Sequence, residues 1–146
     1  MSASVAIDEA LFTWPSDDPR LLGSRCTDCS TVTFPTQTGC PRCNSQAMET
    51  IELPNRGTLW TYTTQGFRPK GPPEGGYLGD DSDETFVPYA LGYVEIPGHC
   101  KVESRLTGAA LDEFRIGMDM GLVIVPFRKD DAGNDVMTFA FKPVSG

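Results

Sequence analysis

The stretch that decides the fold spans residues 26–43 and reads CTDCSTVTFPTQTGCPRC. It holds two C-x-x-C pairs separated by ten residues, residues 30–39. Each pair can wrap a tight turn around one metal ion, and four thiolates complete a tetrahedral sulfur shell. The spacing therefore predicts a rubredoxin-like zinc ribbon whose structural Zn²⁺ is held by Cys26, Cys29, Cys40 and Cys43.

Short strands are expected on both sides of the second pair. Residues 31–34 predict one strand, which Pro35 ends, and residues 48–53 predict another. Asn44 follows the second pair, where a left-handed residue is often needed and Asn tolerates that conformation. Ser30 holds the matching place after the first pair and suits it less well.

The four sulfurs leave other interpretations open. Iron has the same ligand set in rubredoxin-type sites, and disulfides or an empty, degenerate site are further alternatives. The first residues show no basic start and no apolar stretch of signal-peptide length, so we expect a cytoplasmic protein, where paired cysteines favour metal over disulfides. A closed four-sulfur site has no open coordination position, so its predicted role is structural.

The rest of the chain predicts a second, mostly β unit. Alternating β-branched and aromatic residues predict five short strands, at residues 57–64, 86–96, 100–106, 121–127 and 136–141. A helical turn is expected at residues 111–114, between the third and fourth strands. This order predicts a five-stranded barrel of the OB type.

The complete fold prediction is a mostly β chain with a short helix at its start. Residues 7–12 predict that helix, and Asp18-Pro19-Arg20 resembles a helix cap with proline at the first helical position. We expect residues 1–54 to form the helical segment and zinc ribbon, and residues 55–146 to form the OB-fold domain.

The charge of the chain is uneven. The 146 residues carry a net charge of −8, which disfavours nucleic acid as a partner. Residues 55–79 are the exception, with three basic residues and one acidic residue. The basic stretch overlaps the first part of the long connection at residues 65–85, which contains Pro72, Pro73 and several glycines. A solvated loop is one interpretation. The other is a weak CoA- or partner-binding site formed by Arg56, Arg68, Lys70 and Tyr77.

Residues for catalysis are scarce. His99 is the one histidine, and it lies in a Pro-Gly-His turn where an exposed structural role is expected. Cys100 is expected to be a small core residue, and Asp112 with Glu113 to be solvated turn residues. The longest strongly apolar run, residues 122–125, is far too short to span a membrane. No catalytic residue and no membrane partner are predicted.

Motifs along nearly the whole chain resemble one known family. They are RCxxC from Arg25, Phe34-Pro35, CPxC from Cys40, GTLWTYT from Gly57, PYALGYVE from Pro88, RLTG from Arg105, IGM from Ile116, and FAFKP from Phe139. The chain resembles the zinc-ribbon/OB-fold proteins first catalogued as the thirty-fifth domain-of-unknown-function family. Ser30 and Asn44 stand where that family more usually has glycine.

The resemblance implies an accessory role. Members of the family do not carry the chemistry; they bind a thiolase-fold partner and help to form its acyl-CoA site. The C-terminal motif and the proline-rich loop favour the subtype that works with steroid side-chain retro-aldolases, in a heterotetramer. The alternatives are a subunit of a thiolase or hydroxymethylglutaryl-CoA synthase-type complex and, on the fold alone, a module that binds single-stranded nucleic acid.

Overall fold

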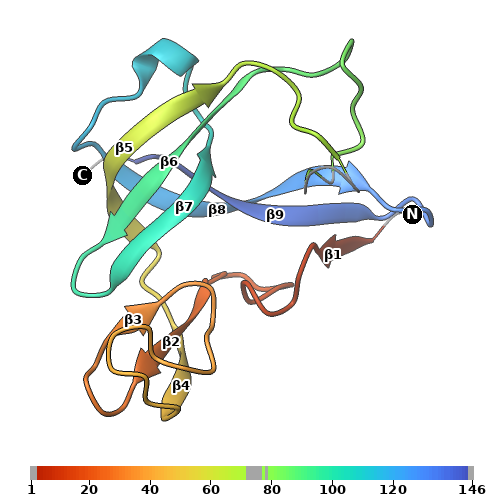
Figure 1. Cartoon of the computed structure of the whole chain (residues 1–146). Coiled ribbons are helices and arrows are strands. Elements are labelled where there is room, and N and C mark those ends of the chain that lie inside the picture. The colour runs from red at the N-terminus through yellow and green to blue at the C-terminus, as the bar shows by residue number, and fades with distance from the viewer. Residues whose placement is uncertain (1–2, 72–76, 78, 145–146) are drawn as a thin grey trace.

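Strands make up almost all of the regular structure in residues 3–71, 77 and 79–144, the part of the chain that this computed structural model describes (Figure 1). They form a three-stranded sheet and a six-stranded sheet. The helical element in the described residues is one 3-10 turn, Leu111–Glu113, where the sequence predicted a helical turn. None of the described helices has the length and apolar character needed to cross a membrane.

The smaller sheet is the zinc ribbon. Its central strand pairs antiparallel with a strand on each side, in the order β3-β2-β4. The strands are β2 (Leu22–Cys26), β3 (Val32–Thr33) and β4 (Met48–Glu52). Strands β3 and β4 lie within the two stretches that the sequence predicted, and β3 ends before Pro35.

The larger sheet closes into a barrel. Its five barrel strands are β5 (Arg56–Gln65), β6 (Tyr89–Ile96), β7 (Cys100–Leu106), β8 (Asp119–Lys129) and β9 (Asp135–Pro143). They follow the order β9-β7-β6-β5-β8, and pairing of β8 with β9 closes the ring. The β7–β9 pair is parallel and the others are antiparallel. This is the predicted five-stranded OB-fold barrel.

Alternation along the strands fills the barrel. In β6, Ala90, Val94 and Ile96 are buried, whereas Tyr93 and Glu95 face outward. Because successive side chains of a strand point to opposite faces, one apolar register supplies the core and the other forms the outer surface.

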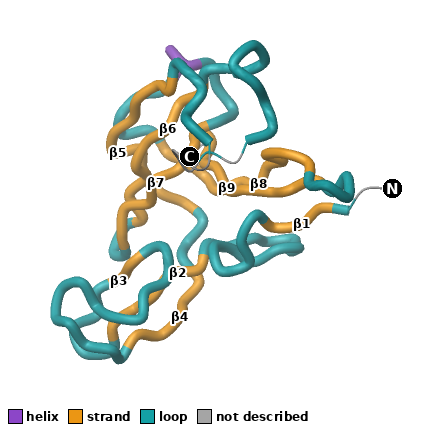
Figure 2. Tube along the Cα trace, turned by 45° about the vertical axis from the view of Figure 1, so that its right-hand side comes forward, coloured by secondary structure: helices purple, strands orange, loops and turns teal. Residues whose placement is uncertain are grey.

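The predicted N-terminal helix is wrong. Residues 7–11 instead form a bend and turns, and Phe12 makes an isolated antiparallel bridge with Leu21. Just before them, β1 (Ser4–Ala6) pairs in parallel with β9 at Asp135–Met137. The chain then turns back on itself, because the Leu22 amide donates to the Leu11 carbonyl and the Thr13 amide to the Arg20 carbonyl. The expected cap at Asp18-Pro19-Arg20 therefore lies in a loop. The loop between β1 and β2 lies between the ribbon and the barrel (Figure 2).

One hydrophobic core joins the two sheets. Phe12, Leu21 and Leu53 are at most 1% exposed, and they share a cluster with barrel residues such as Leu59 and Phe141. Leu21 and Leu53 are also joined by a backbone hydrogen bond of 2.9 Å. The predicted division of the chain after residue 54 remains a prediction.

The long connection between β5 and β6 is described in part. The strand predicted over residues 86–96 begins later in the structure, at Tyr89. The proline and glycine pairs at residues 72–73 and 75–76 of this connection lie outside the described residues.

Candidate functional site

The four predicted cysteine ligands come together at one end of the ribbon. The Sγ atoms of Cys26, Cys29, Cys40 and Cys43 all lie within 4.8 Å of one another. The Cys26–Cys43 and Cys29–Cys40 sulfur pairs are each 3.6 Å apart. Four sulfurs about 2.3 Å from a tetrahedral Zn²⁺ stand about 3.8 Å apart, so this donor set fits the metal.

Two similar turns aim these sulfurs inward. The Ser30 amide donates to the Cys26 carbonyl at 2.8 Å, and the Asn44 amide donates to the Cys40 carbonyl at 2.9 Å. Each turn ends in a left-handed residue, with φ of 66° at Ser30 and 64° at Asn44. The expectation for Asn44 is confirmed, and Ser30 adopts the same conformation. In the second turn, the amides of Arg42 and Cys43 also point at the Cys40 sulfur, at 3.4 and 3.5 Å.

The surroundings separate the thiols in acidity. The hydroxyl and the backbone amide of Thr31 lower the pKa of Cys29 to about 6. The Cys43 backbone amide is the main group that lowers the pKa of Cys40. The Ser45 amide also lowers the pKa of Cys43, but burial and the three other sulfurs outweigh it and raise that pKa to about 12. The thiolate is the form that binds metal, so these hydrogen bonds favour the metal-binding form of Cys29 and Cys40.

The predicted binding residues of the loop form a network around Asp81. The Arg68 Nε donates to the Asp81 carbonyl and carboxylate, at 3.0 and 3.1 Å. The Tyr77 hydroxyl donates to the other carboxylate oxygen at 3.1 Å, and the Arg68 guanidinium lies 5.2 Å from the Tyr77 ring. Burial, followed by the Asp81 hydrogen bond, raises the pKa of Tyr77.

The structure brings together three of the four predicted CoA- or partner-binding residues. The Tyr77 amide donates to the Lys70 carbonyl at 3.2 Å, so Lys70 lies beside Arg68 and Tyr77. Arg56 begins β5, whereas Arg68 follows the end of that strand, so the two arginines lie at opposite ends of β5. Their role in binding CoA or a partner remains a prediction.

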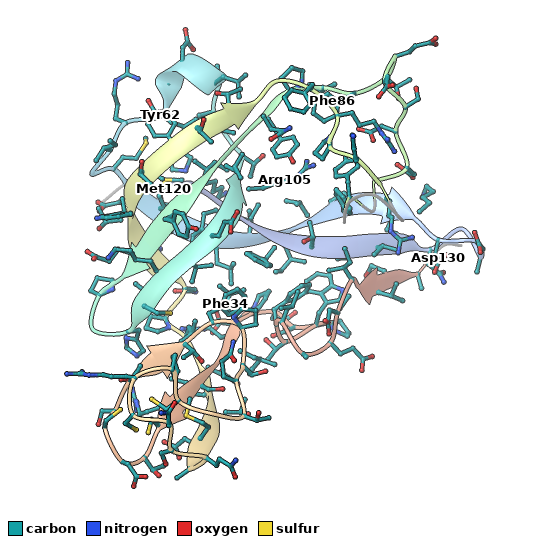
Figure 3. All side chains as sticks on the ribbon, in the orientation of Figure 1. Phe34, Tyr62, Phe86, Arg105, Met120 and Asp130 are labelled. Carbon is teal, nitrogen blue, oxygen red and sulfur yellow. The ribbon has the colours of Figure 1, made fainter. Side chains whose placement is uncertain are left out.

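A groove on the outside of the barrel was not predicted from the sequence. It has a volume of about 640 Å³, and its barrel wall is formed by Tyr89, Leu91 and Tyr93 of β6 and by Lys101, Glu103 and Arg105 of β7. Phe34 of the ribbon and Phe139 of β9 also line it. Figure 3 labels Phe34 and Arg105, which contribute to this groove from the ribbon and from the barrel. The signal for it in the sequence is every second residue of β6 and β7, because those side chains point out of the barrel.

An exposed aromatic patch continues from the groove. Trp60 is 51% exposed, and its ring meets the Tyr93 ring edge to face with centroids 6.3 Å apart. The Lys101 Nζ lies 4.4 Å from the centre of the Trp60 ring. Exposed tryptophan with a charged rim is typical of protein interfaces.

Comparisons with protein families match both units. Residues 14–49 match the family described as "ChsH2, rubredoxin-like zinc ribbon domain". Residues 50–125 match the family described as "ChsH2, C-terminal OB-fold domain". The zinc-ribbon match and the sulfur geometry together support a structural zinc site.

Several known proteins are similar along most of their length. A "DUF35 domain-containing scaffold protein" of Methanocaldococcus jannaschii is 28% identical over 125 residues, which cover 84% of this chain and 79% of the relative. The "Benzoylsuccinyl-CoA thiolase subunit BbsA" of Thauera aromatica is 25% identical over 126 residues, covering 86% and 78%. A solved structure titled "Ltp2-ChsH2(DUF35) aldolase" has a TM-score of 0.61 and 26% identity, and the match covers 85% of this chain and 84% of that one.

Proposed function

This chain belongs to the DUF35 family, and in it a ChsH2-type zinc ribbon precedes a ChsH2-type OB fold, so we propose that it is a non-catalytic accessory subunit of an acyl-CoA enzyme. It binds a thiolase-fold partner and helps to form the acyl-CoA site of that partner. The observation that carries the proposal is the match of both units in this chain, together with relatives that are similar along most of it and are named scaffolds or subunits.

The proposed reaction of the complex is retro-aldol cleavage of a steroid side-chain acyl-CoA. Its support is the similarity to the chain from the Ltp2-ChsH2(DUF35) aldolase. The partner supplies the catalytic groups. This chain supplies a rigid surface, held by the zinc site at one end and the closed barrel at the other.

The exposed aromatic patch is the proposed contact with the partner. Trp60 and Tyr93 offer a large apolar area with few rotamers to lose, and Lys101 provides a polar rim. For CoA, the proposed contacts remain Arg56, Arg68, Lys70 and Tyr77. Within the described residues, neither Arg56 nor Lys70 forms an ion pair, whereas Arg68 is neutralised by Asp81. Arg56 and Lys70 therefore have the charge available to a phosphate.

A second candidate is a subunit of a thiolase-type acyltransferase complex. The observation in its favour is the similarity to the benzoylsuccinyl-CoA thiolase subunit. Both candidates need a thiolase-fold partner, and they differ in whether the complex cleaves an aldol bond or transfers an acyl group.

Affinity capture from the native host tests the proposal. The tagged chain is expected to retain a thiolase-fold protein, identified by mass spectrometry, and the purified pair is then assayed for aldol cleavage and for acyl transfer. Trp60→Ala is expected to weaken assembly, while Val5→Ala, a change at another exposed apolar residue, leaves it unchanged. A partner that is soluble and fully active without this chain contradicts the proposal.

A further inference from the structure

The outer groove occupies the face that OB folds use for ligands. Strands β6 and β7 are the second and third strands of the barrel, and this face with its adjoining loops is the usual OB binding surface. Here the opposite wall comes from Ile7 and Leu11 of the N-terminal loop and from Phe34 and Pro35 of the ribbon. The open platform is thereby converted into a groove of about 640 Å³, a size typical of small-molecule sites.

The β6 wall of the groove and the wall that faces it are apolar. Leu91 projects from β6 between Tyr89 and Tyr93, and Phe34 and Phe139 line the groove as an edge-to-face pair. Ligand sites of this kind combine an apolar lining with a few placed polar groups. The lining fits a ligand with an apolar body.

Arg105 supplies the polar group at one end. Its guanidinium carbon lies 3.7 Å from the centre of the Tyr89 ring and 5.1 Å from that of Phe127. Rings that cover a guanidinium hold it in place. Part of the Arg105 edge faces the Tyr77 hydroxyl, and its remaining N–H groups can bind a carboxylate.

Arg105 has no carboxylate partner within the part of the chain that the structure describes. The carboxylate of Asp81, which borders the neighbouring hollow together with Arg105, is already bound by Arg68 and Tyr77. The two other charged residues of the groove, Lys101 and Glu103, precede Arg105 in β7. Lys101 stacks on Trp60 and lies 3.9 Å from Glu95, and Glu103 repels an anion from the middle of the groove. An acidic group is therefore favoured at the Arg105 end.

We propose that this groove binds a small-molecule carboxylic acid with an apolar body, its carboxylate on Arg105 and its body along Leu91 toward Phe34 and Phe139. This ligand site belongs to the chain alone. It needs neither CoA nor a partner, so it stands or falls separately from the proposed accessory role.

Titration calorimetry of the full-length, zinc-loaded chain tests the proposal, with decanoate as the probe and decan-1-ol as its uncharged match. Decanoate is expected to bind saturably at one site per chain, and Arg105→Gln to weaken it about tenfold or more, as expected for a lost charge-assisted hydrogen bond. Lys142→Gln removes the same charge outside the groove and is expected to leave the affinity unchanged. Leu91→Glu is expected to abolish binding, because Leu91 lies opposite Arg105 in the β6–β7 pair and the new carboxylate would bind the guanidinium in place of the ligand.

Three results overturn the proposal: no saturable binding of decanoate, equal affinity of the wild-type chain for decanoate and decan-1-ol, or equal affinity of the wild-type and Arg105→Gln chains for decanoate. The comparison of the two probes uses the unmodified chain, so it decides the matter even where a variant folds poorly. Zinc content and thermal unfolding of each variant establish that it is folded.

Discussion

The ring of Phe34 meets the ring of Phe139 edge to face, with centroids 5.5 Å apart. Phe34 follows the short strand β3 of the ribbon, and Phe139 lies on β9 of the barrel. Phe12, from the N-terminal loop, packs on the same Phe139 ring at 6.5 Å. A single barrel side chain therefore contacts both segments that precede the barrel in the sequence.

Phe139→Ala is expected to lower the free energy of unfolding by about 2–3 kcal/mol, because it removes both ring contacts. In a double-mutant cycle with Phe34→Ala, we expect a coupling energy of about 1 kcal/mol. Phe67→Ala, at a ring that is 75% exposed, is the control and is expected to change stability very little. Denaturant unfolding measures all of these values, and additive effects of the two changes would argue against a direct contact.

Cys40→Ser is expected to lower the zinc content below one ion per chain, since a structural site needs all four thiolates. Hydrogen exchange should then rise across residues 22–53 before it rises in the barrel. Cys100→Ser changes the fifth cysteine, which lies on β7 outside the cluster, and should retain the metal. Unchanged zinc content and stability in the Cys40 variant would contradict a structural site.

Gly92→Ala is expected to destabilise the chain by about 1–3 kcal/mol through overpacking. A Cβ at this position would collide with the Thr61 carbonyl oxygen and lie 3.0 Å from the Tyr62 Cα, across the β5–β6 pair. Gly66→Ala is the matched control, because a Cβ there has no heavy atom within 4 Å. Equal melting temperatures for the two variants would mean that β5 and β6 do not approach each other this closely.

Arg68→Glu is expected to release the loop between β5 and β6, because it places a carboxylate beside Asp81. Both side chains of the pair are 24% exposed, so we expect a coupling energy of about 1 kcal/mol. The charge swap, Arg68→Glu with Asp81→Arg, should recover part of the loss. Arg68→Glu should also weaken partner assembly or acyl-CoA turnover more than Lys142→Glu does. Equal effects would mean that this loop is a solvated connection with no part in binding.

Asp130→Ala is expected to lower the melting temperature at neutral pH. Its carboxylate accepts from the amides of Asn134 and Ala132, at 2.8 and 3.0 Å, and the Asn134 backbone is the main cause of a pKa below the ordinary 3.8. A lowered pKa in the folded state means stability that is present above the ordinary value and lost as the pH falls through the lowered one. The difference between wild type and variant should therefore be larger at about pH 7 than at about pH 3. Asp131→Ala, next in the turn and with the same change of charge, should show little difference at either pH.

Much of the fold could be predicted because its signals are local. The two C-x-x-C pairs mark their own turns, and the alternation along β5 to β9 shows which side chains enter the barrel. The N-terminal segment gave a wrong prediction because its structure depends on distant residues. Residues 7–12 were predicted as a helix, but the pairing of β1 with β9 fixes the residues just before them, and the hydrogen bond from Leu22 to Leu11 turns the segment back on itself.

The candidate sites divide in the same way. The cysteines lie in two short motifs that the sequence shows directly. The groove collects residues from the N-terminal loop, the ribbon and four barrel strands, so no single stretch shows it. The ion pair of Arg68 with Asp81 could not be predicted for another reason. The sequence shows both charges, but it does not show that these two residues, thirteen positions apart, come into contact.

The parallel pairing of β1 with β9 has a consequence for how the chain folds during its synthesis. The hydrogen bond from the Ala3 amide to the Asn134 side chain links residues 131 positions apart, whereas the ribbon has all its strands once Glu52 is made. Contacts between such distant residues form slowly, because a long loop must close first. On a ribosome, the ribbon can close around its metal while the barrel is still being synthesised. Residues 4–6 leave the exit tunnel early, but they are among the last to pair, because their partner strand β9 is made near the end.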